Sequence, residues 1–401
     1  MRDIDLFQMA LGLTPLWRVS DAKFNLKKKR LDIRIDFPRG STFTCPGCGQ
    51  AGIKAYDTQK KNWRHLNFFQ HEAYLTARVP RIKCDNCGMW LVDVPWARSG
   101  SGFTLLFEAI IMTMAKSMPV KNIAEFINEH DTRLWRLYVD AAKDKADHSS
   151  VHKVGMDETF SKRGQNYVSL FDLEGPKVLF ATEGKDAFTV KCFKQDLTDY
   201  SGEPEAIEEM CGDMSPSFIS GVEKYFHNAH LTFDKFHSMK IVNEAVDEVR
   251  RQEQKDCPEF FRTRYIWLKN FKNLKPSQTK TLEELTIKKL NLKTSRAHHI
   301  KLNFQELFNQ PAEDAEAYLK KWYSWAIHSR LEPIKEAAYT IKRHWDGVLR
   351  WFQSNVNNGI LEGINSLVQA AKARSCGYCT TRNLITMIYL IAGKLKLVLP
   401  S

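Results

Sequence analysis

The sequence lacks any hydrophobic run long enough to cross a membrane. Its most apolar late stretch, LITMIYLIAGKLKLVL, is too short and is interrupted by Lys394 and Lys396. The stretch MRDIDLFQMALGL at the N-terminus has charges at positions 2, 3 and 5, so we expect neither a signal peptide nor a membrane anchor there. Internal repeats and low-complexity tracts are also missing. We therefore expect a cytoplasmic protein with no membrane partner.

Acidic residues are scarce relative to basic ones. The 401 residues include 59 Lys or Arg and 47 Asp or Glu, which gives a formal net charge of +12. A charge of this sign suits a polyanionic partner, nucleic acid first, although solubility alone is the alternative explanation. A hydrophobic content of 43% and a charged content of 26% predict a folded chain, and its length allows two to four domains.

The nine cysteines do not fit a disulfide framework, because their number is odd and four of them form tight pairs. Each of these two pairs, CPGC and CDNC, is followed by glycine, as in a zinc knuckle. Four thiolates suit a structural zinc ion with no open position, and the 35 residues between the pairs leave room for a hairpin. A third CxxC, Cys376–Cys379, has no partner pair and is interpreted as ordinary thiols. The predicted zinc ligands are Cys45, Cys48, Cys84 and Cys87.

A helix-turn-helix is predicted after the cysteine pairs, within residues 103–148. Apolar residues recur at helical spacing over 103–116, a second helix begins near Pro119, and a third follows the turn NEH. This layout fits a motif whose last helix enters a DNA major groove, whereas a plain helical linker domain is the alternative. The groove-facing basic residues of the last helix would be Arg133 and Arg136.

Residues 151–240 predict an alternation of strands and helices. Three strands come first, a helix follows, and then come two more strands with a helix between them. Asp157 lies near the end of the first strand, and Asp213 ends the fourth. The fifth strand, HLTFDKFH, carries Asp234 and His237. The order βββαβαβ is that of the ribonuclease-H-like fold, in which the first and fourth strands are neighbours and their acids face each other.

Two aspartates alone would leave a metal under-coordinated in a two-metal phosphoryl transfer, which needs several carboxylate oxygens around two magnesium ions. A third acid usually comes from a later helix that packs beside the sheet. The stretch NNGILEGINSLVQAAKARSCGY (357–378) predicts such a helix and carries a single acid. Its polar face comprises Asn358, Glu362, Asn365 and Gln369, and Lys372 and Arg374 continue toward a phosphate backbone.

Taken together, these motifs resemble the bacterial insertion-sequence transposases of the ISL-three family. The resemblance covers nearly the whole chain and rests on the two CxxC pairs, the helix-turn-helix, GMDETF, GDMSPSF with the later NAH and DKFH, and NNGILEGINS with GY. It implies a DDE catalytic triad of Asp157, Asp213 and Glu362 that binds magnesium. A D-x-x-H signature follows the second Asp in related transposases, so Asp234 and His237 are expected to support the site. Asp234 as the second acid of the triad is the alternative.

The resemblance also implies a helical insertion before the final Glu, and 148 residues do separate Asp213 from Glu362. Residues 262–301 contain 11 Lys or Arg and two acids, with Trp267 and Phe271 interleaved. This composition suits DNA backbone and unstacked bases, or else a solvated helical face. Four further tryptophans are predicted to lie in a core: Trp322, Trp325, Trp345 and Trp351.

The expected architecture is a multidomain α/β protein in which a ribonuclease-H-like mixed sheet is interrupted by an all-helical insertion. Its expected parts are an N-terminal zinc-ribbon domain (1–98), the helix-turn-helix (103–148), the first part of the catalytic core (151–240), the helical insertion (241–352) and the C-terminal helices of the core (353–401).

The expected function is that of a DDE transposase that binds terminal inverted repeats and target DNA, and that cleaves and joins strands with two magnesium or manganese ions. Holding two DNA ends requires at least a homodimer. In a bacterium such a protein would be cytoplasmic, and nucleoid-associated when bound to DNA. The alternatives are a non-catalytic DNA-binding regulator built from the zinc ribbon and helix-turn-helix, and a domesticated, inactive transposase.

Overall fold

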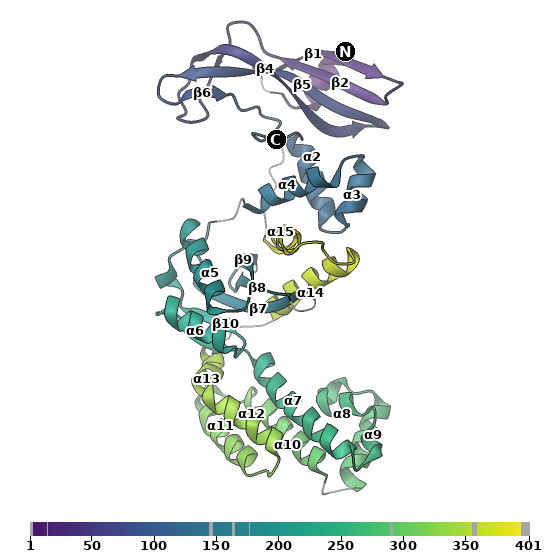
Figure 1. Cartoon of the computed structure of the whole chain (residues 1–401), viewed down its shortest axis with the longest axis vertical. Helices are drawn as coiled ribbons and strands as arrows, with labels where there is room; N and C mark the ends of the chain where they lie inside the picture. Colours follow the sequence, from purple (N-terminus) through teal and green to yellow (C-terminus); the bar gives the residue numbers. More distant parts are fainter. Residues whose placement is uncertain are drawn as a thin grey trace. The chain divides into compact units, whose positions relative to one another are not determined.

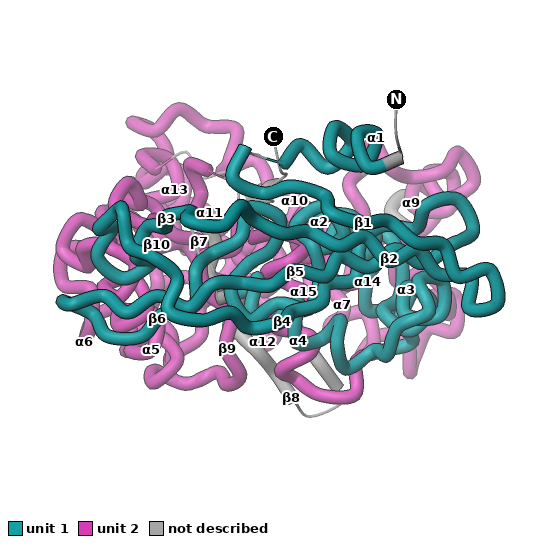
Figure 2. Tube along the Cα trace, turned by 90° about the horizontal axis from the view of Figure 1, so that it is seen from above, with its two compact units in different colours: residues 1–144, 371–377, 394–401 teal, residues 145–370, 378–393 magenta. Residues whose placement is uncertain are grey.

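The computed structural model describes residues 3–13, 15–143, 147–162, 165–175, 177–288, 292–354 and 359–393. The chain forms two compact units, and each is described by itself (Figures 1 and 2). The N-terminal unit comprises residues 1–144, 371–377 and 394–401, drawn in teal in Figure 2. The second unit comprises residues 145–370 and 378–393. No helix within the described ranges is both long and apolar enough to span a membrane.

The N-terminal unit is built around a sheet in the order β1–β2–β5–β4–β3, with β6 beside β5. The bounds are α1 Asp3–Ala10, β1 Arg18–Asn25, β2 Arg30–Asp36, β3 Thr42–Phe43, β4 Ile53–Phe68, β5 His71–Cys84 and β6 Gly88–Leu91. In β2, Leu31, Ile33 and Ile35 are buried and alternate with charged residues, so one face of the strand is turned to the core. Strands β4 and β5 form the hairpin that is predicted between the cysteine pairs.

Three helices follow in the same unit: α2 Leu105–Ala115, α3 Val120–Ile127 and α4 Asp131–Lys143. Val120, Ile123, Ala124 and Ile127 form a buried face of α3, and Leu134, Leu137 and Tyr138 on α4 are buried too. Asn128 ends α3 in the left-handed conformation, with φ +55°, and this turns the chain toward α4. The three helices confirm the predicted helix-turn-helix domain. The motif itself consists of α3 and α4, so α4 is its second helix.

A five-stranded mixed sheet lies in the second unit, in the order β11–β10–β7–β8–β9 (Figure 1). The bounds are β7 Lys153–Lys162, β8 Gln165–Asp172, β9 Lys177–Glu183, α5 Ala187–Asp199, β10 Glu209–Gly212, α6 Pro216–Tyr225 and β11 His230–Phe233. Strand β10 runs parallel to both β7 and β11, whereas β7, β8 and β9 are antiparallel. Phe193 of α5 and Phe218 of α6 share a core with Val154 and Met156 of β7. The predicted order βββαβαβ is therefore confirmed.

Two details of the strand prediction are wrong. Strand β7 does not end near Asp157, because its pairing with β8 continues to Lys162 and leaves the aspartate in the middle of the strand. Strand β11 stops before Asp234 and does not carry His237. The carboxylate of Asp234 accepts hydrogen bonds from backbone N–H groups in the first turn of α7 (Lys235–Gln254), so the chain turns helical there.

Helices α7 to α13 pack around one large hydrophobic core. The bounds of the later ones are α8 Arg264–Leu268, α9 Pro276–Lys288, α10 Lys293–Leu307, α11 Ala312–Ile327, α12 Glu332–Arg343 and α13 Trp345–Ser354. Trp322 and Trp345 are buried in this core, and Trp351 is partly buried against it, as predicted. Trp325 is 46% exposed, so for that residue the prediction is wrong.

Trp267 is not available to stack on DNA bases, which corrects the interpretation of the basic stretch. The side chain is fully buried, and its indole N–H donates to the hydroxyl of Thr263 at 3.3 Å. The helix that carries Trp267 is held from the core side, because Nζ of buried Lys301 donates to the carbonyls of Trp267 and Leu268, each at 2.9 Å. The side chain of Phe271 lies outside the described residues.

Helix α13 is joined to the mixed sheet by an ion pair. The guanidinium of Arg350 donates from Nε to Oε1 of Glu209 on β10 at 2.9 Å, and Thr232 on β11 donates to Oε2 at 2.9 Å. Two helices follow, α14 Gly359–Arg374 and α15 Thr381–Ala392. Helix α15 returns to the sheet, where the hydroxyl of Tyr389 accepts a hydrogen bond from the backbone of Ala181 on β9.

Candidate active site and metal centre

The four predicted zinc ligands converge in the N-terminal unit. The Sγ atoms of Cys45, Cys48, Cys84 and Cys87 all lie within 4.8 Å of one another. The Sγ atoms of Cys48 and Cys84 are 3.6 Å apart. Four thiolates at about 2.3 Å from a tetrahedral zinc stand about 3.8 Å apart, so this spacing fits zinc. Gly49 and Gly88, the residues after each pair, have φ of +76° and +78°, which is the turn that the knuckle requires.

The thiols of this cluster differ in acidity. Burial raises the pKa of Cys45, but the backbone N–H groups of Cys48 and Gly47 and the neighbouring thiols outweigh burial and lower the pKa to about 7. The adjacent Cys48 thiol, together with burial, raises the pKa of Cys87 to about 12. Four thiols this close cannot all ionise without a cation between them, and a bound zinc supplies that charge.

In the second unit, Asp157 and Asp213 come from neighbouring parallel strands. The register pairs Cys211 on β10 with Gly155 on β7. Asp157 follows Gly155 by two residues within β7, and Asp213 follows Cys211 by two residues, just past the end of β10. The two acids therefore lie at the same level of the sheet. Asp213 directly follows β10 and accepts a hydrogen bond from the backbone N–H of Ser215 at 3.0 Å.

Asp157 is the acid whose environment is most altered. Burial, together with the charges of Asp213 and Asp234, raises its pKa to about 6, although His237 and the backbone N–H of Glu158 act in the opposite direction. Its Oδ2 accepts a hydrogen bond from the side-chain amide of Asn365 on α14. A half-buried carboxyl with two like charges nearby is a site that a cation would stabilise.

Asp234 and His237 form a second layer beside these acids. Asp234 is buried, and its Oδ2 accepts from the backbone N–H of Phe236 at 2.9 Å and of His237 at 3.3 Å. The Nδ1 atom of His237 lies 3.4 Å from the same oxygen. Burial alone would lower the pKa of His237, but Asp234, Asp157 and Asp213 outweigh it and raise the pKa. The carboxylate of Asp234 is thus committed to the start of α7 and to this histidine.

Glu362 lies on α14, three residues before Asn365, and so at a neighbouring position on the same helical face. Its side chain lies outside the described part of the structure, as does the whole of Asn358. The contact between Asn365 and Asp157 nevertheless brings this face of α14 to the sheet at Asp157. Gln369, the last residue of the predicted polar stripe, is exposed.

Other acids near the sheet have local roles. Glu158 is half-buried, and burial and the charge of Asp213 raise its pKa. Asp172 lies at a turn, where its Oδ1 accepts from the N–H groups of Glu174 and Gly175. Asp186 caps α5 through the N–H of Thr189. In the sequence, the one indication that Glu158 lies near these acids is its position directly after Asp157.

The four basic residues expected to contact DNA differ in their partners. Arg133 is engaged within the protein: NH1 donates to Glu129 at 2.5 Å, and its guanidinium carbon lies 4.3 Å from the centre of the Phe103 ring. Arg136, three residues later on α4, is exposed, and Lys372 is half-exposed. Arg374 is exposed but donates to the backbone carbonyls of residues 116 and 117, just after α2.

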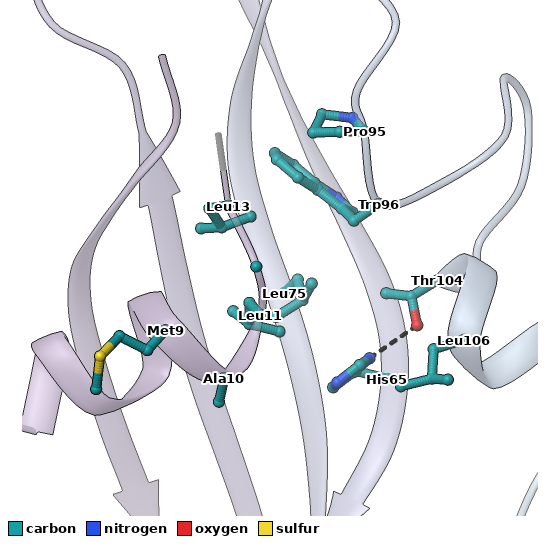
Figure 3. Close-up of a pocket in the computed structure, with 11 residues that line it drawn as sticks. Met9, Ala10, Leu11, Leu13, His65, Leu75, Pro95, Trp96, Thr104 and Leu106 are labelled. Carbon is teal, nitrogen blue, oxygen red and sulfur yellow. Dashed lines mark hydrogen bonds between the residues drawn. The ribbon is translucent and has the colours of Figure 1, made fainter. Parts of the chain in front are cut away.

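A separate cavity of about 410 Å³ opens in the N-terminal unit between α1, the central strands and the start of α2 (Figure 3). Leu75 and Trp96 line it, and His65 contributes Nδ1, which lies 2.8 Å from the hydroxyl of Thr104. Burial, with the nearby Arg64 charge, lowers the pKa of His65 to about 4, so the imidazole is neutral at neutral pH. This cavity contains none of the predicted site residues.

Comparison with known proteins agrees with these features. A family model described as a transposase matches residues 154–388, more than half of the chain. A model for the helix-turn-helix domain of transposase family ISL3 matches residues 92–142. A model for the zinc finger of the transposases of IS204, IS1001, IS1096 and IS1165 matches residues 41–87, which include all four clustered cysteines.

Individual relatives are similar over most of their length. The transposase for insertion sequence element IS1557 of Mycobacterium tuberculosis is 24% identical over 440 aligned positions, which cover 100% of this chain and 98% of the relative. The transposase for IS1001 of Bordetella parapertussis is 25% identical over 354 positions, which cover 85% and 86%. The chain is a DNA transposase of the DDE type, with a zinc ribbon and a helix-turn-helix, and it belongs to the ISL3 transposase family.

Proposed function

We propose that this transposase binds the terminal inverted repeats of its own insertion sequence and cleaves and joins DNA strands by two-metal phosphoryl transfer. The observation that carries the proposal is the pairing of β7 with β10, which sets Asp157 and Asp213 at one level of the sheet. The contact of Asn365 with Asp157 supports Glu362, one turn earlier on α14, as the third acid.

The mixed sheet supports a ribonuclease-H-like core. Its first and fourth strands, β7 and β10, are neighbours, as the predicted fold requires. We propose that α7 to α13 are a helical insertion into this core, between the second and third acids. The ion pair of Glu209 with Arg350 then fixes the end of the insertion to β10, just before α14 begins.

The donor set fits magnesium or manganese, because both prefer carboxylate oxygens. Asp157, Asp213 and Glu362 would hold the ions, which when bound activate the attacking oxygen and stabilise the leaving one. Burial, with the charges of Asp213 and Asp234, raises the pKa of Asp157, and a bound cation would offset these effects, which supports the assignment. Asp234 orients His237, and the carboxylates of Asp234, Asp157 and Asp213 raise the pKa of this histidine.

The helix-turn-helix supports binding to double-stranded DNA, with α4 in the major groove. Arg136 is the better candidate for a groove contact, because Arg133 would first have to leave Glu129 and the ring of Phe103. Lys372 and Arg374 are proposed to contact the phosphate backbone. Two DNA ends must be held at once, so we propose a homodimer or larger assembly on DNA in the bacterial cytoplasm, associated with the nucleoid.

The test is strand cleavage by the purified full-length protein on a labelled duplex that carries the inverted repeat flanking its gene. We expect nicking at the repeat end that requires magnesium or manganese and is lost in Glu362→Ala. Binding of the repeat by the wild type with no cleavage under either metal would refute the catalytic proposal. That result would favour a non-catalytic regulator or a domesticated transposase.

A further inference from the structure

The tip of the N-terminal sheet exposes large apolar side chains. Phe69, in the turn between β4 and β5, is 82% exposed, and Leu26, in the turn between β1 and β2, is 75% exposed. Phe24 beside them is 47% exposed. The rings of Phe69 and Phe24 form a group with that of Phe68. The ring centres of Phe69 and Phe24 lie 4.8 Å and 5.9 Å, respectively, from the ring centre of Phe68. We call these exposed residues, with Lys27 and Lys28, the hairpin tip.

The turn itself does not explain the phenylalanine. Phe68 pairs with His71, so the loop contains only Phe69 and Gln70. Phe69 occupies the first loop position with φ +53°, where a two-residue hairpin favours glycine. A bulky side chain in this left-handed conformation is strained. At this position Phe69 therefore gains neither burial nor a favourable turn.

Positive charge lies directly beside this aromatic group. The neighbouring turn, Leu26–Lys29, carries three consecutive lysines, all exposed. The backbone N–H of Glu72 donates to the carbonyl of Lys29 at 2.9 Å, which holds the two turns together. The carboxylate of Glu72 is itself occupied, because Oε1 accepts from Asn128 at 2.7 Å. Exposed lysines next to an exposed aromatic ring match the chemistry of a nucleic acid, with phosphates beside bases.

The hydrogen bond between Asn128 and Glu72 also connects the hairpin tip to the helix-turn-helix. Asn128 is the residue that ends α3, and α4 begins three residues later, at Asp131. The side-chain amide of Asn128 therefore connects the turn of the DNA-binding motif to the strand that leaves the hairpin tip. A duplex that receives α4 in its major groove passes close to this turn, because the N-terminal end of a recognition helix is the end that contacts base edges.

We propose that the hairpin tip is a second contact with duplex DNA, next to the segment that α4 reads. Phe69 packs against a base step from one groove, and Lys27 and Lys28 contact the adjacent phosphates. The proposal rests on the proposed role of α4 in binding the terminal repeat. It assigns the N-terminal sheet a function in holding DNA that is separate from zinc binding and from catalysis.

The test measures the affinity of the full-length protein for a fluorescently labelled duplex with the terminal repeat, at several salt concentrations. Phe69→Gly suits the backbone of the turn, so we expect an unchanged or higher melting temperature with about tenfold weaker binding. The double variant Lys27→Ala/Lys28→Ala should weaken binding and reduce the slope of log affinity against log salt by about two. Tyr56→Ala is the matched control, because Tyr56 is an exposed aromatic (69%) elsewhere on β4. It should bind as the wild type does.

Two outcomes would overturn the proposal. The first is wild-type affinity in both hairpin-tip variants. The second is a loss of self-association in Phe69→Gly with DNA affinity intact, which would assign the tip to a contact between copies of the chain. Arg136→Ala tests the helix-turn-helix separately. If only Arg136→Ala weakens binding, the tip proposal fails and the proposed function stands. If only the tip variants weaken binding, the assignment of α4 fails.

Discussion

The side-chain amide of Asn365 on α14 donates a hydrogen bond to Oδ2 of Asp157 on β7. The two residues are 208 positions apart in the chain, and helices α7 to α13 lie between them in the sequence. The bond fixes the orientation of a carboxylate that we propose binds metal, and it brings the helix of Glu362 to the sheet. Groups that hold a metal-binding carboxylate in place affect both metal affinity and rate.

The first prediction concerns this bond. Asn365→Ala should reduce cleavage at the terminal repeat by about 10–100-fold and raise the magnesium concentration needed for half-maximal cleavage. The shift in metal requirement is the result that a mere loss of stability would not produce. Ser366→Ala, an exposed neighbour on α14, is the control and should cleave as the wild type does. An Asn365→Ala protein with an unchanged metal requirement would contradict a positioning role.

The second prediction follows from the raised pKa of Asp157. Its folded-state pKa is about 6, above the ordinary value of 3.8, so its contribution to stability is full below about pH 4 and is lost as the pH rises through 6. Asp157→Asn cannot ionise. In magnesium-free buffer it should therefore be more stable than the wild type above pH 6, by about 2 kcal/mol, although it cannot catalyse.

Urea unfolding across a pH series measures this difference. Asp186→Asn is the matched control, because either side chain can cap α5 and no stabilisation is expected. Adding magnesium at pH 7.5 should stabilise the wild type and leave Asp157→Asn unchanged. An Asp157→Asn protein that is less stable than the wild type at pH 7.5 would mean that ionisation of the Asp157 carboxyl does not destabilise the folded protein.

The third prediction compares two helical glycines. A Cβ atom on Gly347 of α13 would clash with the ring of Phe233 on β11, whereas a Cβ on Gly363 of α14 would meet no atom within 4 Å. Alanine is favoured over glycine in a helix by about 1 kcal/mol. Gly363→Ala should therefore stabilise the protein, and Gly347→Ala should destabilise it by about 2 kcal/mol, because α13 must move away from the sheet. Thermal unfolding of the two variants decides this, and equal effects would exclude close packing of α13 on β11.

The fourth prediction concerns zinc. The purified protein should contain one zinc ion per chain, measured by atomic emission, and Cys84→Ser should lose it. Loss of the metal should lower the melting temperature of the N-terminal unit, because Cys45 and Cys84 lie in a small core with Phe43 and Ile82. Cys376→Ser changes a cysteine outside the cluster and should keep the full zinc content. A Cys84→Ser protein with a full complement of zinc would disprove the four-cysteine site.

Features that depend on local pattern could be predicted from the sequence. Alternation in β2, the apolar face of α3 and the spacing of the CxxC pairs all identify elements that the structure contains. Asp213 was predicted at the end of a strand, and it directly follows β10.

Features that depend on tertiary partners could not be predicted. Strand β7 extends past Asp157 because β8 pairs with it, and no residue after Asp157 signals that length. Trp267 lies in a basic stretch that suggests solvent, yet it is fully buried by helices that follow much later. Arg374 has its carbonyl partners 257 and 258 positions away. Local composition predicts neither burial by helices that are distant in the sequence nor hydrogen bonds between residues that are this far apart in the chain.

The most direct test of the account is a comparison of Asp213→Ala with Asp234→Asn in metal-dependent cleavage of the terminal repeat. Asparagine can still cap α7, so Asp234→Asn preserves the start of the helix. We predict that Asp213→Ala abolishes cleavage in magnesium and in manganese, while Asp234→Asn cleaves more slowly than the wild type with the same metal requirement. Cleavage by Asp213→Ala together with none by Asp234→Asn would contradict the account, because the second acid of the site would then be Asp234.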